Sequence, residues 1–197
     1  MTKQLLLVGM LGLLGGTLRA ANPTNLVYID TSFENASPLW YEPAPDGAVL
    51  VHLLYDHERG SPNRAAGHIH FRLEAAPGAR LTLEFKNLDN VWNGRPGSVA
   101  KELKTIVVSS NGRDWTPVPT DALPENRVQI TLEMPGPYLL VARLEPYTAA
   151  DLDRLLDAIR TNPLVQITPI GKTVEGRPLE IIRIGNPQAP HRVFLRA

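Results

Sequence analysis

Apolar and polar residues alternate with a period of two over most of the chain, which is the pattern of half-buried β-strands. The predicted strands are 26–30, 48–55, 68–74, 80–86, 104–110, 127–134 and 138–145. Gly, Pro and Asn separate them, and no helical pattern intervenes, so we predict an antiparallel β-sandwich of the jelly-roll kind. Asn111 and Gly112 both tolerate positive φ and predict a tight hairpin turn, over which Trp115 is expected to pack.

The pattern changes after Tyr147, where apolar residues begin to recur at helical spacing. One helix face would carry four of them: Leu152, Leu155, Leu156 and Ile159. Thr148 is a good N-cap, and Asp151 follows three residues later, as in a capping box with Asp in place of Glu. Asn162 and Pro163 end the predicted helix.

Three further strands are predicted after this helix, at 164–170, 179–185 and 192–197. A helix followed by strands predicts the opening of an α/β domain, but so few elements cannot cover both faces of a sheet. The last strand, "VFLRA", is as apolar as the buried centre of a sheet. We therefore expect a mainly β chain with a sandwich over 22–146 and the truncated start of an α/β domain over 147–197.

The first twenty residues predict an export signal. Lys3 supplies a positive charge, residues 5–14 form an apolar run too short to span a bilayer, and "GGTLRAA" offers small residues for cleavage. We expect residues 1–20 to be a signal peptide and the mature protein to be periplasmic or secreted. A short hydrophobic anchor or a misassigned start is the alternative. The chain has no cysteine, which excludes disulfides and thiolate metal sites.

The charge balance argues against two classes of partner. Lys and Arg together number 20, as do Asp and Glu, so the net charge is zero. Nucleic acids and anionic membranes both attract a basic excess, so we expect no nucleic-acid partner and no membrane partner after signal removal. The oligomeric state is left open.

The stretch "HIHFRLE" is the one candidate metal site. His68, His70 and Glu74 follow the ligand order of a cupin, and imidazole with carboxylate suits Zn, Fe or Mn. The flanking glycines of that pattern are not at their spacings, and no second histidine motif follows. Half-exposed strand histidines are the preferred interpretation.

Exposed tryptophans are candidates for a different activity. Trp92 stands among Asn, Gly and Arg, where it could stack on a sugar ring or anchor a long loop. With Trp40 and Trp115 it would serve a carbohydrate- or peptide-binding module. His57, between Asp56 and Glu58, is expected to lie in a solvated loop. The nucleophile-elbow and phosphate-loop motifs are absent from the sequence.

The segments "YTAADLDRLLDAI", "ITPIGKTVEGRPLEIIRIGNP" and "HRVFLRA" resemble the start of the catalytic domain of M14-type zinc carboxypeptidases. The segments "HIHFRLEAAPGARLTLEFKNLDNVWNGRPGS" and "SSNGRDWTPV" resemble the N-terminal domain of the cytosolic-carboxypeptidase-like branch of that family. The resemblance implies a zinc peptidase that removes C-terminal residues from a peptide or protein substrate.

The resemblance assigns no catalytic, cofactor-binding or metal-binding residue to this chain. The family's first two zinc ligands form His-x-x-Glu, whereas His191 is followed three positions later by Phe194. Lys172, Glu175 and Arg177 mark the family but are expected to be turn residues without chemistry. We therefore expect these 197 residues to bind no catalytic zinc and to be inactive. A secreted carbohydrate- or peptide-binding sandwich is the alternative.

Overall fold

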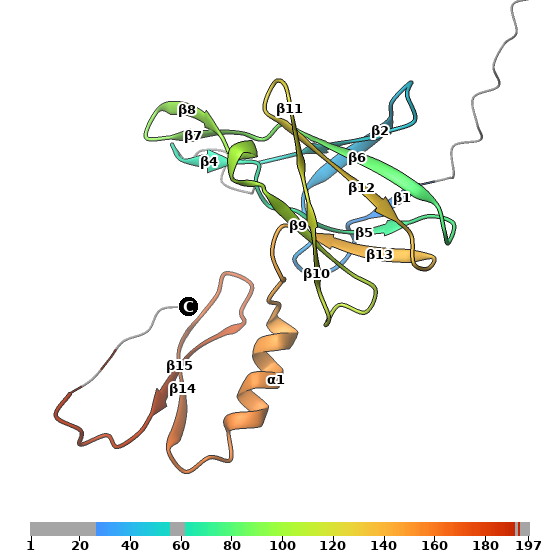
Figure 1. Cartoon of the computed structure of the whole chain (residues 1–197). Coiled ribbons are helices and arrows are strands. Elements are labelled where there is room, and N and C mark those ends of the chain that lie inside the picture. Colours follow the sequence, from blue (N-terminus) through green and yellow to red (C-terminus); the bar gives the residue numbers. More distant parts are fainter. Residues whose placement is uncertain (1–26, 56–61, 192, 194–197) are drawn as a thin grey trace, which may run out of the picture.

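A computed structural model describes residues 27–55, 62–191 and 193, and it shows a mainly β protein (Figure 1). Two five-stranded sheets form its larger part. The first sheet has the order β1 (Tyr28–Asp30), β5 (His70–Glu74), β13 (Tyr138–Ala142), β9 (Thr105–Ser109) and β10 (Thr116–Pro119). The second has the order β11 (Asp121–Leu123), β12 (Arg127–Glu133), β6 (Arg80–Lys86), β3 (Val49–Leu53) and β2 (Leu39–Pro43).

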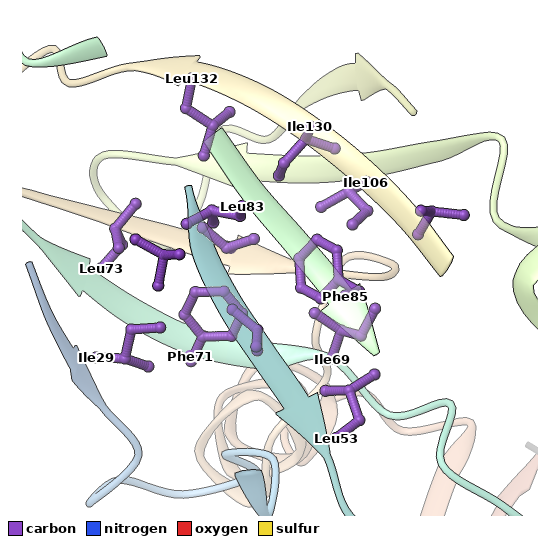
Figure 2. Close-up of a cluster of buried hydrophobic side chains, with 14 of the residues drawn as sticks. Ile29, Leu53, Ile69, Phe71, Leu73, Leu83, Phe85, Ile106, Ile130 and Leu132 are labelled. Carbon is purple, nitrogen blue, oxygen red and sulfur yellow. The ribbon is translucent and has the colours of Figure 1, made fainter. Parts of the chain in front are cut away.

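Alternate side chains of the two sheets build one hydrophobic core (Figure 2). On β5, Phe71 and Leu73 are fully buried, and on β6 so are Leu83 and Phe85. The residues between them, such as Arg72 on β5 and Glu84 on β6, point outward, as the period of two requires. The predicted alternation of apolar and polar residues therefore decides which face of each strand is inside.

One strand pair departs from the predicted antiparallel arrangement. β3 and β6 run parallel, with Val49 beside Leu83, whereas every other described pair is antiparallel. A parallel pair needs a crossover connection, and here the chain passes through β5 of the other sheet between β3 and β6. The sandwich is thus mixed in one place.

A small third sheet contains β4 (Arg64–Ala65), β7 (Asp89–Trp92) and β8 (Arg95–Ser98), followed by a 3₁₀ turn at Ala100–Glu102. Asn93 and Gly94 alone connect β7 to β8, with φ of 49° and 75°. Positive φ at both positions is the geometry of a two-residue hairpin turn. On the sequence alone, Trp92 could anchor a long loop. The segment is instead a hairpin, and Trp92 lies at its tip.

The predicted tight turn at Asn111 and Gly112 was wrong. β9 ends at Ser109 and β10 begins at Thr116, so a longer loop joins them. Gly112 has φ of 73°, but Asn111 acts through its side chain: its Oδ1 accepts the backbone N–H groups of Arg113 and Asp114, each at 2.9 Å. An Asn that caps a loop in this way needs no left-handed backbone.

The predicted helix is present as α1 (Ala149–Ile159), and its capping box is confirmed. The Thr148 amide donates to Asp151 Oδ2 at 2.7 Å, and the Asp151 amide donates to Thr148 Oγ1 at 3.3 Å. A carboxylate of the sandwich adds to this, because Glu34 Oε1 accepts the Ala149 amide at 2.9 Å. Free amides at a helix start favour such acceptors.

After α1 the chain forms a hairpin of β14 (Val165–Lys172) and β15 (Pro178–Ile184), with a bulge between Pro169 and Gly171. Leu156 of α1 is buried, but large apolar side chains of this hairpin are exposed, among them Ile170, Leu179 and Ile184.

Three sequence predictions concern parts of the chain that the structure does not describe. The predicted signal peptide (1–20) and the His57 loop lie outside the described residues, and so does nearly all of the predicted strand 192–197. Within the described part, no helix combines the length and apolar character needed to cross a membrane.

Candidate functional site

A cavity of about 200 Å³ lies where the sandwich meets the segment leading to α1. The start of β5 supplies His68 and His70, the loop between β1 and β2 supplies Asn35, and the segment after β13 supplies residues 143–147. Arg143 points back to the sandwich, since its Nη1 donates to the Gly67 carbonyl at 3.2 Å and its Nη2 lies 3.3 Å from Glu102 Oε2. The cavity therefore mixes imidazole, guanidinium and apolar groups.

The two histidines meet at one backbone oxygen. His68 Nε2 and His70 Nδ1 each lie 2.9 Å from the Asn35 carbonyl oxygen. Because a carbonyl only accepts, both ring nitrogens must carry a proton, which fixes the neutral tautomers as Nε2–H for His68 and Nδ1–H for His70. One oxygen with two lone pairs can satisfy both donors.

Ser37 adds further hydrogen bonds between the β1–β2 loop and the start of β5. Its hydroxyl donates to the His68 carbonyl at 2.9 Å and accepts the His70 amide at 2.6 Å, while its own amide donates to the His70 carbonyl at 2.8 Å. The Phe33 ring meets His70 edge-on, with 5.0 Å between ring centroids. Residues 33–37 thus cover the start of β5.

Burial lowers the pKa of His70, which is only 5% exposed. The nearby His68 lowers this pKa further, and the hydrogen bond to Asn35 opposes the shift without cancelling it. His70 is therefore a neutral hydrogen-bond donor at neutral pH.

Glu74 does not join the two imidazoles, so the cupin arrangement is absent. Its Oε1 lies 2.8 Å from Arg72 Nη2, which also pairs with Asp30 Oδ2 at 2.8 Å. Hydrogen bonds from Ser32 chiefly, and the charge of Arg72, hold the pKa of Asp30 below its usual value. Among the described residues, no three His, Asp or Glu side chains lie close enough together to hold a metal ion.

The three tryptophans lie in different parts of the fold. Trp92 is 66% exposed at the tip of the β7–β8 hairpin. Trp40 on β2 stacks on His52 of β3, with 3.6 Å between ring centroids, and His52 Nε2 lies 3.0 Å from Glu42 Oε1. Trp115 is half-buried before β10, with its ring 6.2 Å from that of His70. Trp92 is the most available for a ligand.

The residues of the "GKTVEGRP" segment lie at the turn between β14 and β15. Gly176 has φ of 82°, and Glu175 and Arg177 form an exposed ion pair at 3.2 Å. Thr173 closes the turn, since its amide donates to the Arg177 carbonyl at 2.8 Å. Lys172 ends β14 and is exposed. A pair this exposed contributes little to stability.

No protein-family model matches the chain, and no curated protein sequence matches it either. Solved structures do match. Its structural neighbours are carboxypeptidases. A protein of Burkholderia mallei named as a carboxypeptidase matches 83% of this chain at 22% identity, with a TM-score of 0.70. A metallo-carboxypeptidase of Burkholderia cenocepacia matches 85% at 23% identity, with a TM-score of 0.67.

A third neighbour is a metallo-carboxypeptidase of Pseudomonas aeruginosa, solved in complex with (2-guanidinoethylmercapto)succinic acid. It matches 82% of the chain at 19% identity, with a TM-score of 0.62. This chain spans 40%, 42% and 41% of the three neighbours' own lengths. At these identities the likeness establishes a shared fold.

Proposed function

We propose that this chain is the N-terminal part of an exported zinc metallocarboxypeptidase of the M14 type. In this proposal residues 1–20 are an export signal, 22–146 form the N-terminal sandwich and 147–197 begin the catalytic α/β domain. The observation that carries it is the match to metallo-carboxypeptidase structures over more than four fifths of the chain. The "GKTVEGRP" segment, which forms the β14–β15 turn, supports the same family.

The described residues of this chain do not fit a catalytic zinc. Such a site needs three protein ligands and an open position for water. The described part offers no group of three His, Asp or Glu, and the sequence contains no His-x-x-Glu. We therefore assign these residues no step of hydrolysis and propose that the 197 residues alone are inactive as a peptidase.

The test compares two proteins: these 197 residues, and the chain that results when the reading frame is followed beyond codon 197. Zinc content is measured by native mass spectrometry, and activity by release of C-terminal residues from peptides. We expect zinc and turnover only in the longer chain. Tight zinc with turnover in the 197 residues contradicts the proposed inactivity. A frame without His-x-x-Glu contradicts the family assignment.

The exposure of Trp92 favours a second candidate, a carbohydrate- or peptide-binding sandwich. An aromatic face at a hairpin tip can stack on a sugar ring or fill a pocket of a protein partner. A glycan and peptide array probed with the whole chain would reveal such binding. Trp92→Ala should abolish it, while Trp40→Ala, whose ring already stacks on His52, should not. Equal loss in both variants would contradict this candidate.

A further inference from the structure

The loop between β1 and β2 touches the sandwich on one side and α1 on the other. Asn35 and Ser37 bind it to the start of β5 through the bonds described above. Glu34, the residue before Asn35, accepts the first amide of α1 at 2.9 Å. Adjacent residues of one short loop thus hold β5 and α1.

We propose that residues 33–37 form a proton-sensitive latch: protonation of His70 releases the loop from β5 and thereby breaks the bond between Glu34 and α1. This inference uses only described contacts and does not rest on the proposed function.

His70, on the strand that the latch covers, is the group that responds to protons. Phe33 and Trp115 lie against its ring, and its Nδ1–H is taken by Asn35, so an added charge would have little access to water. The charged and titratable groups around the cavity are His68, Arg143, Glu145 and Tyr147, with Glu34 in the loop and Arg72 on the same strand. Within the described part, no carboxylate forms an ion pair with His70.

A buried imidazolium without a carboxylate partner is unfavourable, and a second imidazole beside it adds repulsion. Moving residues 33–37 away would give the ring access to water. Such a movement removes the Asn35 and Ser37 bonds together, because only one residue separates them. Glu34 moves with its neighbour and leaves the Ala149 amide without its acceptor.

Release of the loop would weaken the attachment of α1 to the sandwich and would leave the helix itself intact. The capping box of Thr148 and Asp151 satisfies the first turn from within the helix and does not involve the loop. The latch therefore controls how the C-terminal unit is held at the sandwich.

The experiment is an NMR titration of the whole ¹⁵N-labelled chain from pH 8 to pH 3. It follows the His70 ring and the Ala149 amide. We expect the Ala149 resonance to move with the midpoint of the His70 ring, below the ordinary histidine value of 6.5. An Ala149 amide that responds only to carboxyl titration, near about pH 4, would overturn the proposal.

Three variants isolate His70 from other sources of pH dependence. His70→Asn keeps an N–H where Nδ1 stands but does not titrate, so Ala149 should stay in its bonded position down to pH 5. His68→Gln keeps the Nε2 donor and removes the repulsion, so the transition should remain and its midpoint should move to higher pH. His52→Gln is the control at a distant histidine and should leave the transition unchanged. A His70→Asn protein that titrates like the wild type overturns the latch.

Glu34→Ala tests the other end. At every pH its Ala149 amide should exchange about tenfold faster than in the wild type, with the resonances of the sandwich core unchanged. Glu34→Gln, which keeps an oxygen acceptor, should restore slow exchange. Exchange at Ala149 that is the same in Glu34→Ala and in the wild type contradicts the role of Glu34. If a histidine variant does not fold, the coincidence of the two wild-type midpoints still decides.

Discussion

Phe71 and Phe85 meet at the centre of the core, one from each sheet. Their ring centroids lie 6.3 Å apart with the planes inclined by 45°, and both side chains are fully buried (Figure 2). Such a pair adds a specific aromatic contact to the burial of two large apolar surfaces. It ties the two sheets together at one point.

Truncating Phe85 to Ala should therefore destabilise the protein strongly. The lost burial and the cavity left in a packed core together cost about 3–5 kcal/mol of unfolding free energy. Urea unfolding followed by circular dichroism measures it. The exposed Trp92→Ala should change the same quantity by less than about 0.5 kcal/mol. Similar losses in the two variants would contradict the core assigned to Phe85.

Gly94 is the residue on which the β7–β8 turn depends. Its φ of 75° is costly for any residue with a Cβ, although a Cβ there would meet nothing within 4 Å. Gly94→Ala should cost about 1 kcal/mol through backbone strain alone. Gly136→Ala is the matched control, because that site is equally open and has no positive φ. Chemical denaturation compares the unfolding free energies of the two variants. Equal losses would contradict backbone strain at Gly94.

At the scale of elements, the strands that the sequence predicted best lie inside the sheets. β6 was predicted with its observed bounds, because Leu81, Leu83 and Phe85 alternate with polar residues. In the two large sheets β2, β10 and β11 were missed, and all three are edge strands; the whole of the small third sheet, β4, β7 and β8, was missed as well. An edge strand is less covered by the rest of the protein, so burial imposes less of an alternating apolar and polar pattern on its sequence. β2 is mostly exposed and ends in Pro43.

The N-terminus of α1 depends on Thr148, whose hydroxyl accepts the Asp151 amide at 3.3 Å. Thr148→Ala should weaken the first turn by about 1 kcal/mol. Faster hydrogen exchange of the α1 amides would show it, with the sandwich amides as internal reference. Thr148→Ser keeps the hydroxyl and should exchange like the wild type. Loss of protection in Thr148→Ser as well would point to packing of the methyl group.

The same helix should weaken in acid. The side-chain hydroxyl of Thr148, its amide and Arg154 all hold the pKa of Asp151 below its ordinary 3.8. Because the folded pKa is lowered, this contribution is fully present above that value and is lost as the pH falls through the folded pKa. Hydrogen exchange of the α1 amides between pH 5 and pH 2 measures this loss of stability. In Asp151→Asn the pH dependence of that exchange should disappear. An unchanged profile in Asp151→Asn would contradict it.

At the scale of the whole molecule, the sandwich and the C-terminal unit differ in how they are stabilised. The sandwich has a closed core of residues from both sheets. The β14–β15 hairpin leaves Ile170, Leu179 and Ile184 exposed, and Leu156 is the one buried residue of α1. Exposed apolar groups of this kind are common at surfaces that other segments cover.

Stability of the whole fold should depend on His70. Burial lowers its pKa, so between the folded value and 6.5 the unfolded chain binds a proton that the folded protein does not. The free energy of unfolding should therefore fall as the pH drops below 6.5 and stay level above it. Urea midpoints at pH 7.5 and at pH 5 measure the fall. His70→Asn should reduce it, and an equally steep fall in that variant would contradict the role of His70.

The sequence by itself determined the interior strands of the two five-stranded sheets, the helix with its capping box and the polar turn at Glu175–Arg177, because each depends on neighbours within a few residues. Only the tertiary structure decided the parallel β3–β6 pair and the histidine cluster. The sequence placed His68 and His70 together and weighed Glu74 as a third metal ligand, but it favoured half-exposed strand histidines, whereas His70 is buried. In the structure they meet the carbonyl of Asn35, 33 and 35 residues away, and Glu34 reaches Ala149 across 115 residues. A backbone carbonyl has no signature in the residue type, and a contact across that distance exists only once the chain has folded.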